Sequence, residues 1–142
     1  MRPEQLEDLL RYRMEQAHET LREAEILLNE SALRGTINRA YYAMFYALLA
    51  LLAIKQLGTS RHSGALALFD REFVKTGVFP RELSRSLHLA FDHRQTYDYG
   101  EITQVSHQTA EETLMSAQTF VAAIESYLRS IGHLAAVQQE DG

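Results

Sequence analysis

Apolar residues recur along the chain at alternating steps of three and four, which is the repeat of an α-helix with one buried face. One such stripe predicts a helix over residues 3–29, where Pro3 suits the first helical turn. The clearest stripe predicts another helix over residues 110–131 and has the spacing of an antiparallel-bundle seam. Because no stretch alternates as a half-buried strand does, the pattern predicts an all-α protein.

Three further helices are expected between these two. The first covers residues 32–56 and should end at Gly58, a residue that accepts the left-handed conformation of a helix cap. Its central part is apolar on every side, as in a helix that is buried among its neighbours. Ser60 is suited to begin a helix that ends near Gly77, and the fourth helix of the chain should cover residues 80–97.

Length and composition fit one helical domain. The chain has 142 residues, of which 46 % are hydrophobic, so it can bury a core of ordinary size. We expect an up-and-down bundle of four to five helices over residues 1–132, followed by a flexible, acidic tail over residues 133–142. The longest apolar stretch, residues 40–54, is shorter than the roughly 20 residues that cross a bilayer. We therefore expect a cytoplasmic protein without membrane contact.

The charge and the residue types exclude several kinds of site. The net charge is −5, so RNA would have to bind at a local basic cluster and not through an overall field. The absence of cysteine excludes thiolate metal sites and a cysteine nucleophile, and the six histidines are not spaced as metal ligands. No phosphate-binding or dinucleotide-binding glycine motif is present. We expect neither a metal nor a cofactor.

Two stretches combine polar and aromatic residues in a way that is typical of one family. They are residues 38–46 in the buried helix and residues 91–100 at the end of the fourth helix. Together with residues 61–64 and 72–75, they make the chain resemble the HEPN domain family, in particular its small stand-alone members. The resemblance covers residues 6–128 and implies an up-and-down helical bundle that forms a homodimer. It also implies a partner, which is a separately encoded minimal nucleotidyltransferase.

Catalytic members of this family are metal-independent endoribonucleases with a short motif. The motif is an arginine, a polar residue, a histidine four to six residues after the arginine, and often a tyrosine just beyond. Arg94 matches the arginine and Gln95 the polar residue, but Asp98 stands where a histidine is expected. The resemblance implies that Arg94 binds phosphate, and it makes Asp98 and Tyr99 the other candidate catalytic residues. Tyr99 or Tyr97 is also the candidate acceptor for nucleotidyl transfer onto the protein.

An aspartate in place of the histidine changes the expected chemistry. A carboxyl with an ordinary pKa near 4 is a poor acid at neutral pH, and its charge repels phosphate. On a helix, Arg94 and Asp98 also form an i,i+4 pair, whose structural contribution is about 0.3–0.5 kcal/mol. The order is basic before acidic and close to a helix C-terminus, which is unfavourable for stability and so favours a functional role. His93 could supply an imidazole across a dimer interface, but its side chain points about 100° away from that of Arg94, which favours a structural role for it, as for His88.

Two further pairs of residues are candidate ligands of RNA or a nucleotide. Arg39 and Tyr42 lie in the buried helix, where an inward arginine needs a carboxylate partner. They either form an internal network that fixes the helix register or line a pocket with Arg94. Arg61 and His62 lie at a predicted helix N-terminus, where free N–H groups and the helix dipole favour an anion, although capping alone explains the surrounding residues.

Three functions remain compatible with the sequence. The first is a dimeric binding module that partners a minimal nucleotidyltransferase in a toxin–antitoxin-like or nucleotide-sensing pair and binds RNA or a nucleotide near Arg94. The second is a metal-independent endoribonuclease toxin that uses Arg94 and a substitute for the missing histidine. The third is a helical scaffold without either chemistry. The aspartate at position 98 favours the first function over the second.

Overall fold

Five α-helices and one π-helical turn form the described part of the fold. The computed structural model describes residues 1–99 and 104–135 of the chain. In chain order the elements are α1 (Pro3–Asn29), α2 (Leu33–Ala53), α3 (His62–Phe69), η1 (Asp70–Val74), α4 (Arg81–Tyr99) and α5 (His107–Ser130). The described residues contain no strand, which confirms the expected all-α class.

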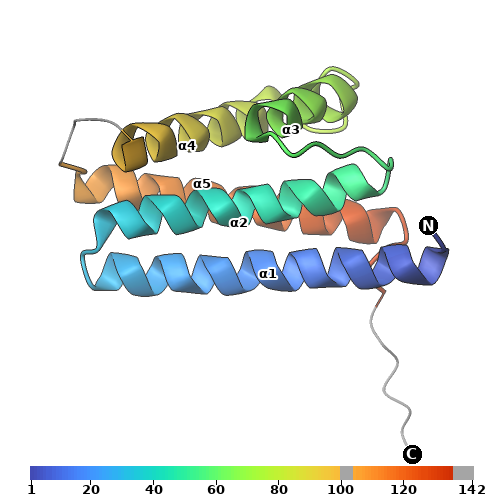
Figure 1. Cartoon of the computed structure of the whole chain (residues 1–142), viewed down its shortest axis with the longest axis horizontal. Coiled ribbons are helices and arrows are strands. Elements are labelled where there is room, and N and C mark those ends of the chain that lie inside the picture. The colour runs from blue at the N-terminus through green and yellow to red at the C-terminus, as the bar shows by residue number, and fades with distance from the viewer. Residues whose placement is uncertain (100–103, 136–142) are drawn as a thin grey trace, which may run out of the picture.

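The four long helices form an up-and-down bundle, as the sequence predicted (Figure 1). α1 and α4 run in one direction along the bundle, and α2 and α5 run in the other. α2 is the central helix, because it contacts α1, α3, α4 and α5. Of its 21 residues 12 are buried, which confirms that this all-round apolar helix lies among the others. No helix within the described ranges is long and apolar enough to cross a membrane.

The end of α2 differs from the expectation. The helix ends at Ala53, and Gln56 takes the left-handed conformation, with φ 54°, in place of Gly58. The Leu57 N–H then donates to the Leu52 carbonyl at 3.0 Å, which closes the helix as in a Schellman motif. The prediction of Gly58 as the cap was wrong. The hydrogen bond between Leu57 and Leu52 requires the left-handed conformation at position 56, although the residue at that position is a glutamine.

The third predicted helix is divided in two. α3 ends at Phe69, and η1 continues it with a wider turn in which the Lys75 N–H donates to the Asp70 carbonyl at 2.9 Å. The Asp70 carboxylate accepts a hydrogen bond from Ser84 and pairs with His88 of α4 at 2.8 Å. These contacts fasten η1 to α4 and give His88 a structural role.

The chain after α5 turns back onto α1. Gly132 adopts a left-handed conformation, with φ 94°, and the two following residues reach Glu7. His133 pairs with the Glu7 carboxylate, and the Leu134 N–H donates to it at 3.2 Å while the Leu134 side chain is buried. The hydrogen bond with His133 holds the pKa of Glu7 below its usual value. The sequence predicted a flexible tail from this point, and residues 136–142 of that tail lie outside the described residues.

Candidate functional site

Arg94 extends from α4 toward α2 and is held by aromatic and acidic side chains. Its Nη2 donates to the Tyr42 hydroxyl at 2.9 Å, and its Nε lies 3.3 Å from Oδ2 of Asp98, one helical turn further on. The guanidinium carbon lies 5.7 Å from the ring centroid of Tyr41 and 5.2 Å from that of Tyr42. Only 12 % of the side chain is exposed. The guanidinium is therefore largely removed from water, where cation–π and charge interactions are stronger than on an open surface.

Asp98 also connects α4 to the polar residues of α2. Its Oδ2 accepts a hydrogen bond from Asn38 Nδ2 at 2.9 Å, and Asn38 Oδ1 accepts from Arg39 Nε at 3.1 Å and from Arg39 Nη2 at 2.8 Å. Arg39 Nη1 in turn lies 3.9 Å from the Glu23 carboxylate of α1. The carboxylate that Arg39 was expected to need thus comes from the first helix. The result is a chain of polar contacts that crosses three helices.

Tyr42 lies where the two arginines meet. The guanidinium carbon of Arg39 is 5.1 Å from the Tyr42 ring centroid, and that of Arg94 is 5.2 Å from the same centroid. A tyrosine ring attracts cations at its face, so it allows two guanidinium groups to approach each other. The structure therefore brings together Arg39, Tyr42 and Arg94, three of the residues that the sequence predicted to bind RNA or a nucleotide.

His62 reaches the same cluster from the start of α3. Its Nδ1 lies 2.7 Å from the hydroxyl of Tyr41, and its ring stacks in parallel on Phe45 with 4.1 Å between centroids. The His62 ring is also 5.7 Å from the ring of Tyr42. Arg61, predicted with His62 to bind phosphate, is the exposed N-cap residue of α3, and its N–H donates to the Thr59 side chain at 3.2 Å. α3 thus starts after Arg61 and not after the predicted Ser60.

Burial fixes the protonation of this histidine and its tyrosine partner. Burial lowers the pKa of His62, and the nearby positive charge of Arg94 lowers it further. Burial also raises the pKa of Tyr41, against a smaller opposing effect of Arg94. At neutral pH both groups are therefore uncharged. His62 carries a proton on only one ring nitrogen, and Tyr41 keeps its hydroxyl proton.

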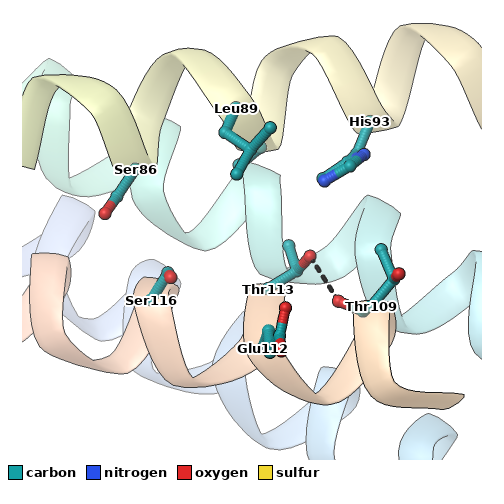
Figure 2. Close-up of a pocket in the computed structure, with 8 residues that line it drawn as sticks. Ser86, Leu89, His93, Thr109, Glu112, Thr113 and Ser116 are labelled. Atoms are coloured by element: carbon teal, nitrogen blue, oxygen red, sulfur yellow. Dashed lines mark hydrogen bonds between the residues drawn. The ribbon is translucent and has the colours of Figure 1, made fainter.

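His93 lies on a different side of α4 from Arg94. Figure 2 shows its imidazole pointing into the space between α4 and α5, where it lines a small pocket with residues of both helices. The pocket has a volume of about 100 Å³ and is lined also by Ser86, Leu89, Ala90, Thr109, Glu112, Thr113 and Ser116. The His93 ring stacks on Tyr97 with 5.9 Å between centroids. Arg94 instead contacts α2, so the structure separates these two neighbours as the helical geometry predicted.

The remaining predicted site residues lie apart from this cluster or outside the described residues. Gln95 is exposed on α4. The side chain of Tyr99 lies outside the described part of the structure, although its backbone is the last residue of α4. Within residues 1–99 and 104–135, no group of three or more histidine, cysteine or acidic side chains is placed to hold a metal ion.

Two residues of the cluster were not among the predicted site residues. Asn38 joins Arg39 to Asp98, and Tyr41 joins His62 to the face of Arg94. Both belong to the polar and aromatic stretch of α2, which is an unusual composition for a buried helix. That composition was the available signal, but their partners lie 60 and 21 residues away along the chain.

Comparison with known proteins identifies the family. The family model described as "HEPN domain" matches residues 10–127 of the chain. A Thermotoga maritima protein named "UPF0332 protein" is 40 % identical over 125 residues, which are 88 % of this chain and 95 % of that protein. A Methanocaldococcus jannaschii protein named "Putative toxin MJ0142" is 34 % identical over 117 residues, which are 82 % of this chain and 80 % of that protein. The resemblance that the motifs suggested is confirmed, and the chain belongs to the HEPN domain family.

Proposed function

We propose that this chain is the HEPN module of a toxin–antitoxin-type pair and binds a phosphate group of RNA or of a nucleotide at Arg94. The observation that carries the proposal is the setting of Arg94, whose guanidinium lies almost out of water between Asp98 and the rings of Tyr41 and Tyr42. A guanidinium binds phosphate with paired N–H groups, and it binds more strongly where the surroundings exclude water. The toxin name of the Methanocaldococcus jannaschii relative supports the assignment to such a pair.

The same setting is a poor way to stabilise a fold. Removing a guanidinium from water costs several kcal/mol, and its attraction to a partly exposed carboxylate often fails to offset that cost. An apolar side chain at position 94 would pack against the two tyrosines without this cost. A binding role accounts for an arginine here better than a structural role does.

Asp98 sets the strength of the proposed binding. Its carboxylate lies beside the guanidinium, so a phosphate has to compete with it or share the arginine with it. Arg39, which donates to the amide oxygen of Asn38 and faces Tyr42, adds a second positive charge to the same cluster. We therefore expect moderate affinity from one chain and a stronger site where two copies meet.

Binding of a short fluorescent single-stranded RNA, measured by fluorescence anisotropy, tests the proposal. Arg94→Ala should weaken binding about tenfold or more, because a hydrogen bond to a charged group contributes about 1.5–3 kcal/mol. Arg85→Ala removes an exposed arginine from the same helix and is the matched control. Equal binding by the wild type and Arg94→Ala would refute the proposal and leave the scaffold function.

The proposal includes two protein partners. The first is a second copy of the chain, because one Arg94 provides half of a family-type site. The second is a separately encoded minimal nucleotidyltransferase, with Tyr97 or Tyr99 as the acceptor of a transferred nucleotidyl group. A monomeric mass in light scattering at micromolar concentration would contradict the first partner. An unchanged mass of the chain after incubation with the nucleotidyltransferase and nucleoside triphosphates would contradict the transfer.

A metal-independent endoribonuclease is the second candidate function. The specific observation in its favour is that an uncharged imidazole, His62, lies in the cluster that holds Arg94. Binding alone does not need this group, whereas cleavage needs a group that transfers a proton.

A further inference from the structure

His62 differs from the other histidines in the partner that it has. Four of the six histidines of the chain pair with carboxylates, in the pairs His18–Glu125, His88–Asp70, His107–Glu111 and His133–Glu7. His62 instead contacts the hydroxyl of Tyr41, a side chain with no exposed surface. A carboxylate stabilises the positive charge of an imidazolium. A buried hydroxyl is uncharged and can form a hydrogen bond with the neutral ring. His62 is therefore placed to remain an uncharged imidazole.

The position of His62 relative to Arg94 suits a single ribonucleotide. The Arg94 guanidinium carbon is 5.2 Å from the centroid of the Tyr42 ring, and the His62 ring is 5.7 Å from the same centroid. The ring of Tyr41 also lies 5.7 Å from both groups. The cation and the imidazole thus border the same pair of tyrosine rings. The positive charge of Arg94 also acts on the His62 ring, so a nucleotide whose phosphate binds Arg94 would lie near the imidazole.

Asp98, which occupies the usual position of the family histidine in the sequence, is less suited to proton transfer. Its Oδ2 accepts a hydrogen bond from Asn38 and lies 3.3 Å from the Arg94 guanidinium. Oδ2 of the carboxylate is therefore already engaged by two groups of the protein itself. A group that replaces the histidine in function would then come from another element of the fold.

We propose that His62 is the catalytic base of a ribonuclease site, and that it accepts the 2′-hydroxyl proton of an RNA strand whose phosphate is bound by Arg94. This inference rests on the proposed function, because it needs Arg94 to hold the phosphate. The proton moves from the 2′ oxygen to Nε2 of His62, and a bond forms between that oxygen and phosphorus. The bond between phosphorus and the 5′ oxygen breaks, and the leaving oxygen takes a proton from water.

The products of this step are a 2′,3′-cyclic phosphate and a free 5′-hydroxyl, and His62 returns its proton to the solvent before the next cycle. Tyr41 is a positioning residue. For Nε2 to accept a proton, the other ring nitrogen, Nδ1, must carry the hydrogen and donate it to the Tyr41 oxygen. Because burial raises the pKa of Tyr41, this tyrosine keeps its own proton and does not compete for the one that His62 receives.

Cleavage of a single-stranded RNA in the presence of a chelator tests the proposal, with RNA binding measured on the same samples. His62→Asn should lower the cleavage rate about 100-fold or more, which is the usual contribution of a general base. Its amide can still bond Tyr41, so RNA binding should change by less than about threefold. The control His93→Asn, which removes an imidazole between α4 and α5, should cleave at the wild-type rate. An RNA with a 2′-deoxy sugar at the cleaved position should resist cleavage.

The pH profile of the wild type gives a second test that does not depend on the folding of a variant. Within the described residues, the titratable or charged groups that face the His62 ring are Tyr41 and Tyr42 from α2 and Arg94 from α4. The cleavage rate should rise with pH through a single ionisation below the usual histidine pKa of about 6.5 and stay constant above it. A profile without this ionisation would overturn the proposal.

The outcomes separate this inference from the proposed function. If the wild type binds RNA through Arg94 but does not cleave it, the role of His62 is refuted and the binding module stands. If His62→Asn cleaves as fast as the wild type, His62 is only a packing residue. If Arg94→Ala binds RNA as well as the wild type does, the proposed function fails, and the inference about His62 fails with it. Loss of cleavage with retained binding in His62→Asn alone would support both.

Discussion

Replacing Arg94 with methionine separates a functional arginine from a structural one. Methionine has a similar length and no charge, so it can pack against the rings of Tyr41 and Tyr42. The substitution removes the hydrogen bond to Tyr42 and the contact with Asp98. It also removes the cost of holding a guanidinium that is 12 % exposed.

The expected change in unfolding free energy is small, because these effects oppose each other. A hydrogen bond from a charged group contributes about 1.5–3 kcal/mol, and each cation–π contact about 0.5–2 kcal/mol. The desolvation penalty of a buried ion is several kcal/mol, which is of the same size. Asp98 keeps its hydrogen bond to Asn38 after the substitution, so little further cost arises from the carboxylate. We expect Arg94→Met to lie within about 1.5 kcal/mol of the wild type.

Urea unfolding followed by circular dichroism measures this change, and Leu87→Ala provides the comparison. Leu87 lies on the same helix and has no exposed surface, so its truncation should cost about 2–5 kcal/mol. RNA binding by Arg94→Met should fall about tenfold or more. If Arg94→Met is as destabilised as Leu87→Ala and binds RNA normally, Arg94 is a structural residue and does not bind RNA.

Three further substitutions have expected outcomes that follow from single contacts. Asp98→Asn removes the charge that competes with phosphate at Arg94, so anisotropy should show RNA binding several-fold tighter than the wild type; equal or weaker binding would contradict this role. Gly132→Ala places a side chain at φ 94° and should lower the unfolding free energy by about 1–2 kcal/mol, as measured by thermal unfolding. Gly58→Ala, at a position without positive φ, is the control and should lower it by less than half as much. Because the pKa of Glu7 is lowered in the folded chain, its contribution to stability is complete above pH 4.5 and is lost as the pH falls through the lowered value, so Glu7→Gln should flatten the loss of stability in acid.

The bundle was predictable because its information is local. Helical periodicity placed α1 at its observed bounds and placed α5 within a few residues of its own, and the all-round apolar composition of α2 placed it at the centre. The helix ends were less predictable. At the end of α2, Gln56 takes the left-handed conformation because the Leu57 N–H reaches the Leu52 carbonyl, and no residue preference indicates that choice.

Of the contacts in the candidate site, only the local ones follow from helical geometry. The contact of Arg94 with Asp98 follows from their spacing of one helical turn and is present at 3.3 Å. The approach of His62 to Tyr41 depends on how the segment between α2 and α3 turns back across α2, which periodicity does not encode. The sequence therefore indicated a missing histidine, whereas the structure indicates an imidazole that reaches the cluster from another helix.

The salt dependence of RNA binding shows most directly whether Arg94 binds phosphate. A phosphate contact in single-stranded RNA changes the slope of log K against log salt by about 0.7, because binding releases a condensed counterion. Arg94→Ala should therefore bind more weakly and show a slope shallower by about 0.7 for each copy of the site that contacts the strand, while Arg85→Ala should keep the wild-type affinity to within a few-fold. An unchanged slope and affinity in Arg94→Ala would show that Arg94 does not bind phosphate.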